Sequence, residues 1–369
     1  NRLTMSRMGP LWMRNFITNL PLLAGKDIAG FKTDKNIMLC GAGESLEGTI
    51  PYIRSHRDSL YLLAVDTAVQ HLCRNDLVPD GVVNLEAQFY NLKDFYPVLH
   101  SRIDLFSDIT AYPASLRQEC HNQYFFASSF QETSLHRKLR ALELLPREIP
   151  PLGSVGVAAL YLAGELTRGT VFITGLDFSY LEGKTHARET PFHDWCRLQE
   201  TRLKGDVWYS FSRSRPSTPA DALPPGAVTN RILESYARQL EDIARTMPGR
   251  VINLAERGMK MSIPGPGTEL PAERAVEPPS AARVQKKNTT ALWAFIRKEK
   301  EILEDLIRIW DDVCAGRAGE EELLPLLSVC DYLYFHFPDR ETLPHTEPVF
   351  LFRVMKEARS LVRRFSIPT

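Results

Sequence analysis

The sequence has 369 residues, and its 44% hydrophobic and 24% charged content is that of a globular protein with a sizeable core. Lysine plus arginine and aspartate plus glutamate both number 45, so no overall positive charge attracts nucleic acid or an anionic membrane. No apolar run reaches the ~18 residues of a membrane span, and no cysteines have zinc spacing. Several of the six cysteines lie inside apolar runs, which fits a reducing compartment, so we expect a cytoplasmic protein.

Residues 1–35 are expected to be a helical N-terminal segment. The chain begins at Asn1 rather than Met, which indicates a truncated or trimmed start. The start shows no signal-peptide pattern.

From residue 36 onward, short apolar runs alternate with helical patterns. Continuous apolar strands separated by helices are typical of a parallel sheet covered on both faces. The sequence therefore predicts an α/β fold with a Rossmann-like, doubly wound, mostly parallel sheet. The expected strands are 36–40, 60–65, 82–85, 103–106, 124–127, 171–174 and 251–254, with an Ala- and Leu-rich helix over 154–166.

Two stretches interrupt this alternation. Residues 181–227 lack a period and are expected to be a long excursion, whereas the Pro- and Gly-rich residues 264–288 are expected to be a linker. We therefore predict a core over 36–263 and a helical C-terminal domain over 289–369. Apolar positions at helical spacing predict its helices near 291–313, 323–334 and 349–362.

The first candidate motif is Gly41-Ala42-Gly43-Glu44-Ser45, directly after a strand. The glycines permit a tight turn, and the start of the following helix offers N–H groups to an anion. Leu46 stands where the dinucleotide fingerprint has its third glycine, and there is no Walker lysine. A plain turn with Ser45 as a helix cap explains the motif equally well.

Acidic side chains and a second small-residue turn complete this candidate site. Asp66, followed by Thr67, and Glu86 end two predicted strands, and ligands of doubly wound sheets bind at that edge. Helix capping is the alternative for Asp66. Gly153 and Ser154 open the helix at 154–166 and can present N–H groups and a hydroxyl to a phosphate.

One loop after the strand at 171–174 carries four chemically active side chains. Asp177, Tyr180, Lys184 and His186 supply an acid, a phenol, a cation and an imidazole. An imidazole suits proton removal from an attacking hydroxyl, and a lysine can neutralise a phosphate leaving group. A solvated loop histidine is the alternative for His186.

Aromatic and basic residues over 195–215 are a candidate lid for an acceptor, although surface packing accounts for them equally well. They are Trp195, Arg197, Arg202, Trp208, Tyr209, Phe211, Arg213 and Arg215.

Several of these motifs, in this order, resemble the Maf (motility accessory factor) family with its MptE-like Rossmann core. The resemblance covers about residues 36–262, and its most specific element is Gly183-Lys184-Thr185-His186-Ala187. The other matching segments are 41–46, 64–68, 79–86, 153–155, 175–180 and 251–256. Two positions differ from the family pattern. Glu44 stands where the family usually has a proline, and Leu85-Glu86-Ala87 replaces the more usual Leu-Asp-Pro.

The resemblance implies a glycosyltransferase that moves a nonulosonic acid (sialic, pseudaminic or legionaminic type) from its CMP-activated form to Ser/Thr of flagellin. The Maf core is similar in fold to bacterial lipooligosaccharide sialyltransferases, which need no essential metal, so we expect no cofactor or metal. By the resemblance, Gly41, Gly43, Ser45 and the Gly153-Ser154 turn hold the CMP phosphate and ribose. Asp66 and Glu86 line the nucleotide or sugar, and His186 is the general base.

Two alternatives remain open. The core also resembles archaeal 6-hydroxymethylpterin diphosphokinase, which moves diphosphate from ATP with a divalent metal, but the single Glu86 gives few hard ligands for that metal. The other alternative is a non-catalytic nucleotide-binding docking module of flagellar assembly, with 289–369 as its interaction surface.

Overall fold

The computed structural model describes residues 2–95, 102–128, 131–181, 183–208, 210, 214, 216–265, 288–342 and 345–365. The described residues form a nine-stranded sheet in the order β1-β6-β5-β4-β3-β2-β8-β12, with β7 paired to β6. Its strand pairs are all parallel, which confirms the predicted fold class. The strands are β1 Lys26–Asp27, β2 Asn36–Cys40, β3 Leu60–Val65, β4 Gly81–Asn84, β5 Asp104–Asp108, β6 Asn122–Ser128, β7 Glu148–Ile149, β8 Val171–Thr174 and β12 Val251–Asn253.

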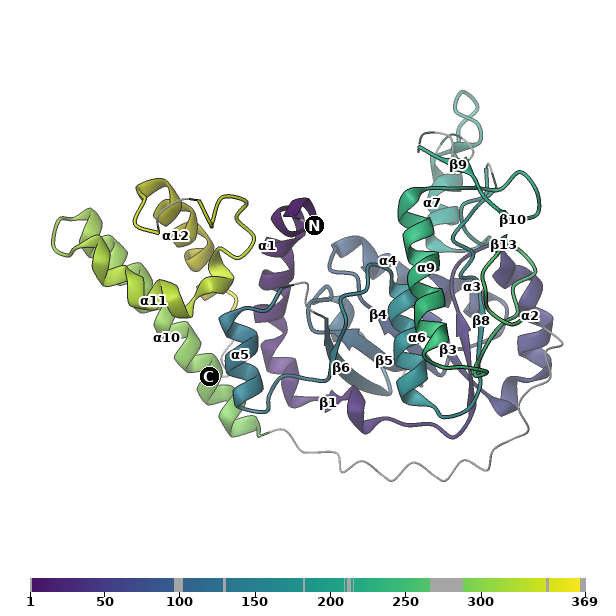
Figure 1. Cartoon of the computed structure of the whole chain (residues 1–369), viewed down its shortest axis with the longest axis horizontal. Helices are drawn as coiled ribbons and strands as arrows, with labels where there is room; N and C mark the ends of the chain where they lie inside the picture. The colour runs from purple at the N-terminus through teal and green to yellow at the C-terminus, as the bar shows by residue number, and fades with distance from the viewer. Residues whose placement is uncertain are drawn as a thin grey trace.

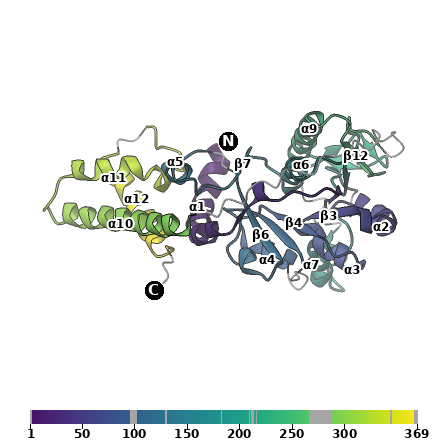
Figure 2. The same cartoon turned by 90° about the horizontal axis from the view of Figure 1, so that it is seen from below.

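The centre of the sheet is buried on both faces. Strand β2 pairs with β3 through Met38 opposite Leu62, and with β8 through Met38 opposite Phe172. Helices cover the two faces, with α6 and α9 on one side and α3, α4 and α7 on the other (Figure 2). This is why the strands are continuous apolar runs rather than alternating ones. The helices are α2 Ser45–Ser55, α3 Val69–Arg74, α4 Leu92–Phe95, α5 Ser134–Ala141, α6 Val155–Leu166, α7 Pro191–Gln199 and α9 Arg231–Arg245.

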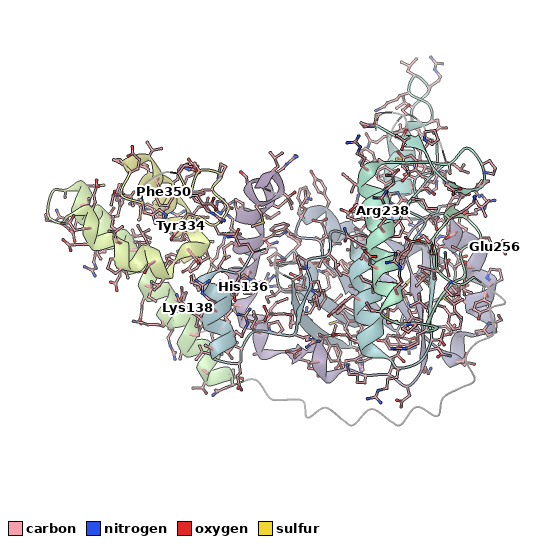
Figure 3. All side chains as sticks on the ribbon, in the orientation of Figure 1. His136, Lys138, Arg238, Glu256, Tyr334 and Phe350 are labelled. Carbon is pink, nitrogen blue, oxygen red and sulfur yellow. The ribbon has the colours of Figure 1, made fainter. Side chains whose placement is uncertain are left out.

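The N-terminal helix α1 (Arg2–Asn19) lies between the sheet and the C-terminal helices (Figure 1). The C-terminal helices are α10 (Thr289–Cys314), α11 (Leu324–Val329) and α12 (Pro348–Val362). Helices α10 and α12 lie close to their predicted bounds, whereas the helix predicted near 323–334 is the shorter α11, followed by a separate 3-10 turn, Asp331–Leu333. Helix α5 also faces this module, and Lys138 on α5 lies close to it (Figure 3). Buried residues of α1, the sheet and the C-terminal helices belong to one hydrophobic cluster.

The excursion predicted over 181–227 is only partly irregular. It contains α7, which begins with Thr190 as its N-cap and Pro191 in the first turn, a favourable start for a helix. The long amphipathic helix α9 and the two-residue strands β1 and β7 had no counterpart in the prediction. Two antiparallel pairs also lie outside the main sheet: β9 (Thr218–Pro219) with β11 (Val228–Thr229), and β10 (Ala222–Leu223) with β13 (Gly258–Met259).

Most of the predicted linker, residues 266–287, lies outside the described residues, as do Tyr209, Phe211, Arg213 and Arg215 of the candidate lid. The boundaries at 36–263, 264–288 and 289–369 therefore stay predictions. Among the described helices, none combines the length and apolar character that crossing a membrane requires.

Candidate functional site

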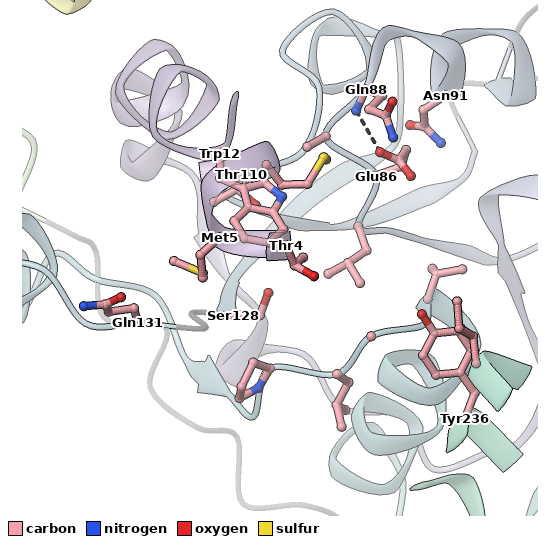
Figure 4. Close-up of a pocket in the computed structure, with 18 of the residues that line it drawn as sticks. Thr4, Met5, Trp12, Glu86, Gln88, Asn91, Thr110, Ser128, Gln131 and Tyr236 are labelled. Atoms are coloured by element: carbon pink, nitrogen blue, oxygen red, sulfur yellow. Dashed lines mark hydrogen bonds between the residues drawn. The ribbon is translucent and has the colours of Figure 1, made fainter. Parts of the chain in front are cut away.

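A cavity of about 830 Å³ opens at the carboxyl ends of the strands, and we call it the strand-end cavity. One side is built from residues at or just after β3, β4, β5 and β6. Two helices that are distant in sequence, α1 and α9, supply the other sides, with Trp12 and Met5 across from Tyr236 (Figure 4). Its lining includes Met5, Met8, Trp12, Asp66, Thr67, Glu86, Asn91, Asp94, Thr110, Ser128, His136, Gly153, Arg231 and Tyr236.

Asp66 is the central acid of the strand-end cavity. The chain turns sharply after β3, so the Asp66 carboxylate accepts bonds from its neighbour's backbone, Thr67 N (2.8 Å), and from Thr67 Oγ1 (3.2 Å). Its second oxygen, Oδ2, accepts a bond from Asn91 Nδ2 at 2.6 Å. Asp66 is only 3% exposed, and this burial raises its pKa above the ordinary value despite these bonds.

Two further polar residues of this cavity were not predicted. Asn91 and Asp94 lie three residues apart on the short helical stretch that follows Glu86, and both are buried. Burial, followed by the charge of Asp66, raises the pKa of Asp94. Glu86 itself accepts a bond from the backbone N–H of Gln88 at 2.9 Å. The polar Asn-x-x-Asp spacing a few residues after the strand that precedes Glu86 was the available sequence signal.

The helix α1 covers the cavity because two asparagines on one of its faces bind loop backbone. Asn15 Nδ2 donates to the carbonyl oxygens of Ala87 (2.8 Å) and Thr110 (2.9 Å). Asn19, one turn later, donates to two carbonyl oxygens within 109–111, each at 2.9 Å. These bonds fix α1 over the loops that follow β4 and β5, and they place its Met- and Trp-bearing face in the cavity wall.

The start of α6 also reaches the strand-end cavity. Gly153 lines it, and a Cβ at this position would come within 2.7 Å of the Tyr236 ring on α9. Ser154 is the N-cap of α6, has an extended backbone and makes no capping bond with its side chain. The first N–H groups of α6 and the Ser154 hydroxyl are therefore available near the cavity.

The predicted Gly41–Ser45 turn lies elsewhere, packed against the loop after β8. The Asp177 carboxylate accepts bonds from the Ser45 backbone N–H (2.9 Å) and from the Ser45 hydroxyl, which in turn accepts from Gly175 N at 2.9 Å. Burial raises the pKa of Asp177 to about 6. The start of α2 thus already holds an anion, the protein's own carboxylate.

A second pocket of about 630 Å³ lies on the outer side of this turn, and we call it the charged pocket. Lys184 Nζ lies 3.2 Å from Glu44 and 3.0 Å from Glu47, and Arg257 also pairs with Glu44 at 2.6 Å. Ser45 and Arg188 also line this pocket.

Among the described residues that line the two pockets, the predicted catalytic residues His186 and Tyr180 are absent. His186 Nδ1 lies 3.1 Å from Thr185 Oγ1, and its ring lies 5.2 Å from that of Phe192. Tyr180 is buried, and its backbone pairs with that of Val228.

From the candidate lid, Trp208 is buried and donates to Thr185 Oγ1 at 2.9 Å, whereas Trp195 is 43% exposed.

The structure therefore divides the predicted site into two groups. Asp66, Thr67, Glu86 and Gly153 meet in the strand-end cavity, with Ser154 beside it. Glu44, Ser45 and Lys184 line the charged pocket, and the buried contact that includes Gly41, Gly43 and Asp177 adjoins it. Within the ranges that the structure describes, no group of three or more His, Cys, Asp or Glu side chains has a metal-binding arrangement.

Comparisons with known proteins agree with this architecture. Residues 14–183 match the family described as 6-hydroxymethylpterin diphosphokinase MptE-like. A MAf glycosyltransferase from Magnetospirillum magneticum AMB-1 superposes with a TM-score of 0.52 over 96% of this chain and 54% of its own. Its sequence identity is 14%, so this likeness concerns the fold.

Two uncharacterized proteins of Treponema pallidum (strain Nichols) are similar in sequence. One is 27% identical over 394 residues, which cover 97% of this chain and 67% of the relative. The other is 36% identical over 90 residues, which cover 24% of this chain and 43% of the relative. The chain thus spans between about two fifths and two thirds of the proteins it resembles.

Proposed function

We propose, from the premise that this chain belongs with the Maf/MptE-like proteins through residues 14–183, that it is a glycosyltransferase. The donor is a CMP-activated nonulosonic acid, and the acceptor is a Ser or Thr hydroxyl of flagellin. The observation that carries the proposal is the strand-end cavity, because a fold shared with a glycosyltransferase places a polar, ligand-sized space at the carboxyl edge of the sheet.

The cavity's chemistry supports an anionic sugar nucleotide. Its volume of about 830 Å³ is in the range of small-molecule sites. The Ser154 hydroxyl and the N–H groups at the start of α6 suit a phosphate, and Arg231 at the start of α9 adds a positive charge to the cavity wall. Asp66 and Glu86 are suited to accepting bonds from sugar or ribose hydroxyls. We assign the phosphate to α6 rather than α2, since Asp177 already satisfies the start of α2.

The roles expected of the other predicted residues are also proposals. Gly41 and Gly43 shape the turn beside the site, and Glu44 and Lys184 belong to the charged pocket. His186 is a candidate base from the loop after β8, with Tyr180 nearby in sequence, although neither residue lines the strand-end cavity. We propose a reaction without an essential metal. All six cysteines are free, which supports the cytoplasm as its location.

One observation favours a second candidate function. The matching family is described as 6-hydroxymethylpterin diphosphokinase MptE-like, and the acids Asp66, Glu86 and Asp94 all line the strand-end cavity, although among the described residues they do not form a ready-made metal-binding group. Carboxylate oxygens are the ligands through which Mg²⁺ assists transfer from ATP. A non-catalytic docking module built on a degenerate nucleotide-binding core is the third possibility, and it predicts binding of neither CMP nor ATP.

Calorimetric titration separates these functions. Wild-type protein is titrated with CMP, with and without EDTA, and with ATP plus Mg²⁺. Micromolar CMP binding that is unchanged by EDTA and lost in Ser154→Trp supports the glycosyltransferase. The matched control is Ser328→Trp, on the exposed side of α11, which should bind CMP like the wild type. Binding of ATP only with Mg²⁺ supports the kinase, and binding of neither supports the docking module.

A further inference from the structure

The cavity contains two buried carboxyl groups and a buried amide. Asn91 donates from Nδ2 to Asp66 Oδ2 at 2.6 Å, and Asp94 follows three residues later in the same cavity wall. Asp66 is 3% exposed and Asp94 is 8% exposed, yet both line the strand-end cavity. Two carboxyl groups in such a setting resist carrying two negative charges together, so the pair readily takes up a proton.

Asn91 gives independent reason to expect a ligand at this place. Its side chain is 1% exposed and lines the cavity, and its Oδ1 finds no hydrogen-bond partner among the described residues. Leaving a buried amide oxygen unpaired is unfavourable, because the oxygen has lost its bonds to water, so a donor group of a bound molecule is the natural partner. Asn91 thus marks the position of a hydroxyl- or amine-bearing ligand next to the acid pair.

We propose that Asp94, which lines the strand-end cavity together with Asp66 and Asn91, is the proton acceptor for the hydroxyl of the acceptor substrate. This rests on the proposed function, but it needs only a hydroxyl nucleophile. As the hydroxyl oxygen forms its bond to the anomeric carbon, the bond from that carbon to the CMP phosphate breaks. Its electron pair leaves with CMP, and the hydroxyl proton passes to the Asp94 carboxylate.

The surrounding charges suit a base of this kind. Glu86 at the end of β4 adds negative charge that favours proton uptake, whereas Lys93 on α4 opposes it. Arg231 on α9 and His136 on α5 line the same cavity from its other walls. Burial and the neighbouring acids together raise the pKa of Asp94 towards neutrality, where proton transfer from a hydroxyl is most effective.

The test compares three variants in the full chain with CMP-sialic acid as donor and a serine-containing flagellin peptide as acceptor. Asp94→Asn should lower turnover at least 100-fold and leave CMP affinity within threefold, whereas the exposed Asp305→Asn serves as the matched control. The rise of kcat with pH should vanish in Asp94→Asn. Unchanged turnover in Asp94→Asn would overturn the inference, and so would a loss of CMP binding as large as the loss of turnover. It would also be overturned if the rise of kcat with pH disappeared in His186→Asn and not in Asp94→Asn.

A second measurement needs no substrate. Carbon-13 NMR of the aspartate carboxyl groups, assigned with Asp66→Asn and Asp94→Asn, should show two transitions above the ordinary aspartate range. In Asp94→Asn, the Asp66 transition should move to lower pH. Ordinary titration of both groups near pH 4 contradicts the acid pair. Failure of the wild type to bind CMP contradicts the proposed function instead, so the two failures are distinguishable.

Discussion

Asp177 shows how one side chain decides what a glycine-rich turn can bind. The Gly41–Ser45 turn has the residues of an anion site, but its helix start is filled by a carboxylate from the loop after β8, 132 residues away. A buried acceptor that satisfies both a backbone N–H and a hydroxyl is a structural element of the fold. The same bonds leave the start of α6 as the better phosphate site.

Removal of this carboxylate should destabilise the protein. Asp177→Ala leaves the Ser45 N–H and hydroxyl without their buried acceptor, so we expect it to lower the free energy of unfolding by about 1–3 kcal/mol more than Asp177→Asn. The asparagine retains one oxygen acceptor in nearly the same volume. Urea unfolding followed by circular dichroism measures the difference, and equal losses in the two variants would contradict this role.

The pH dependence of stability should also reflect Asp177. Its folded pKa of about 6 lies above the ordinary aspartate value near 4, so its contribution is fully present below about pH 4 and is lost as the pH rises through about 6. The free energy of unfolding of Asp177→Asn, minus that of the wild type, should therefore increase by about 2 kcal/mol between pH 4 and pH 6.5. If this difference in unfolding free energy stays constant between pH 4 and pH 6.5, the pKa of Asp177 is not raised in the folded protein.

At the scale of elements, glycine allows the turn after β2 to contact the loop after β8. A Cβ at Gly41 would lie 2.2 Å from the carbonyl oxygen of Gly175, and one at Gly43 would lie 2.5 Å from Asp177 Oδ2. The β2 and β8 turns therefore touch through backbone. The neighbouring Gly48, inside α2, is exposed, and a Cβ at this position would have no other atom within 4 Å.

Gly41 and Gly48 should respond in opposite directions to alanine. Gly41→Ala forces the backbone turns apart and should destabilise the fold by about 3 kcal/mol. Gly48→Ala gains helix propensity and should stabilise it by about 0.5–1 kcal/mol. Thermal unfolding of both variants measures this, and a tolerated Gly41→Ala would show that the turns are not in contact.

At the scale of the whole molecule, the C-terminal helices are fastened to the sheet region by buried polar bonds. Glu299 on α10 is 2% exposed and accepts from Lys138 Nζ on α5 at 2.8 Å and from the Tyr332 hydroxyl at 2.7 Å. Arg14 on α1 pairs with Glu357 on α12 at 3.0 Å. The C-terminal helices thus contact α1, the helix that closes the strand-end cavity, so the module supports the cavity wall.

Breaking the Glu299 cluster should therefore affect the whole chain. Glu299→Ala leaves a lysine and a tyrosine hydroxyl without their shared acceptor, and we expect a loss of about 3–5 kcal/mol of unfolding free energy. Glu301→Ala, exposed on the same helix, should change it by about 0.5 kcal/mol or less. Similar unfolding midpoints for both variants would show that the helical module is only loosely attached.

The sequence predicted the fold better than the site. Strands β2, β3 and β8 have the predicted bounds, because continuous apolar runs between helices report burial on both faces. The helix α9 was missed, although its polar and apolar residues alternate at helical spacing, since it lies close to the irregular excursion. Asn91 and Asp94 were missed because a four-residue helix carries almost no periodic signal.

By itself, the sequence determined the parallel α/β sheet, the strand ends that carry Asp66 and Glu86, and the helical C-terminal portion. These features depend on local periodicity and on which residues follow a strand. Only the tertiary structure decided that α1 covers the strand ends, that Asp177 fills the start of α2, and that Asp94 joins Asp66. Each of these depends on a contact between segments distant in the chain or on burial, and the free energy of such contacts leaves no local pattern in the sequence.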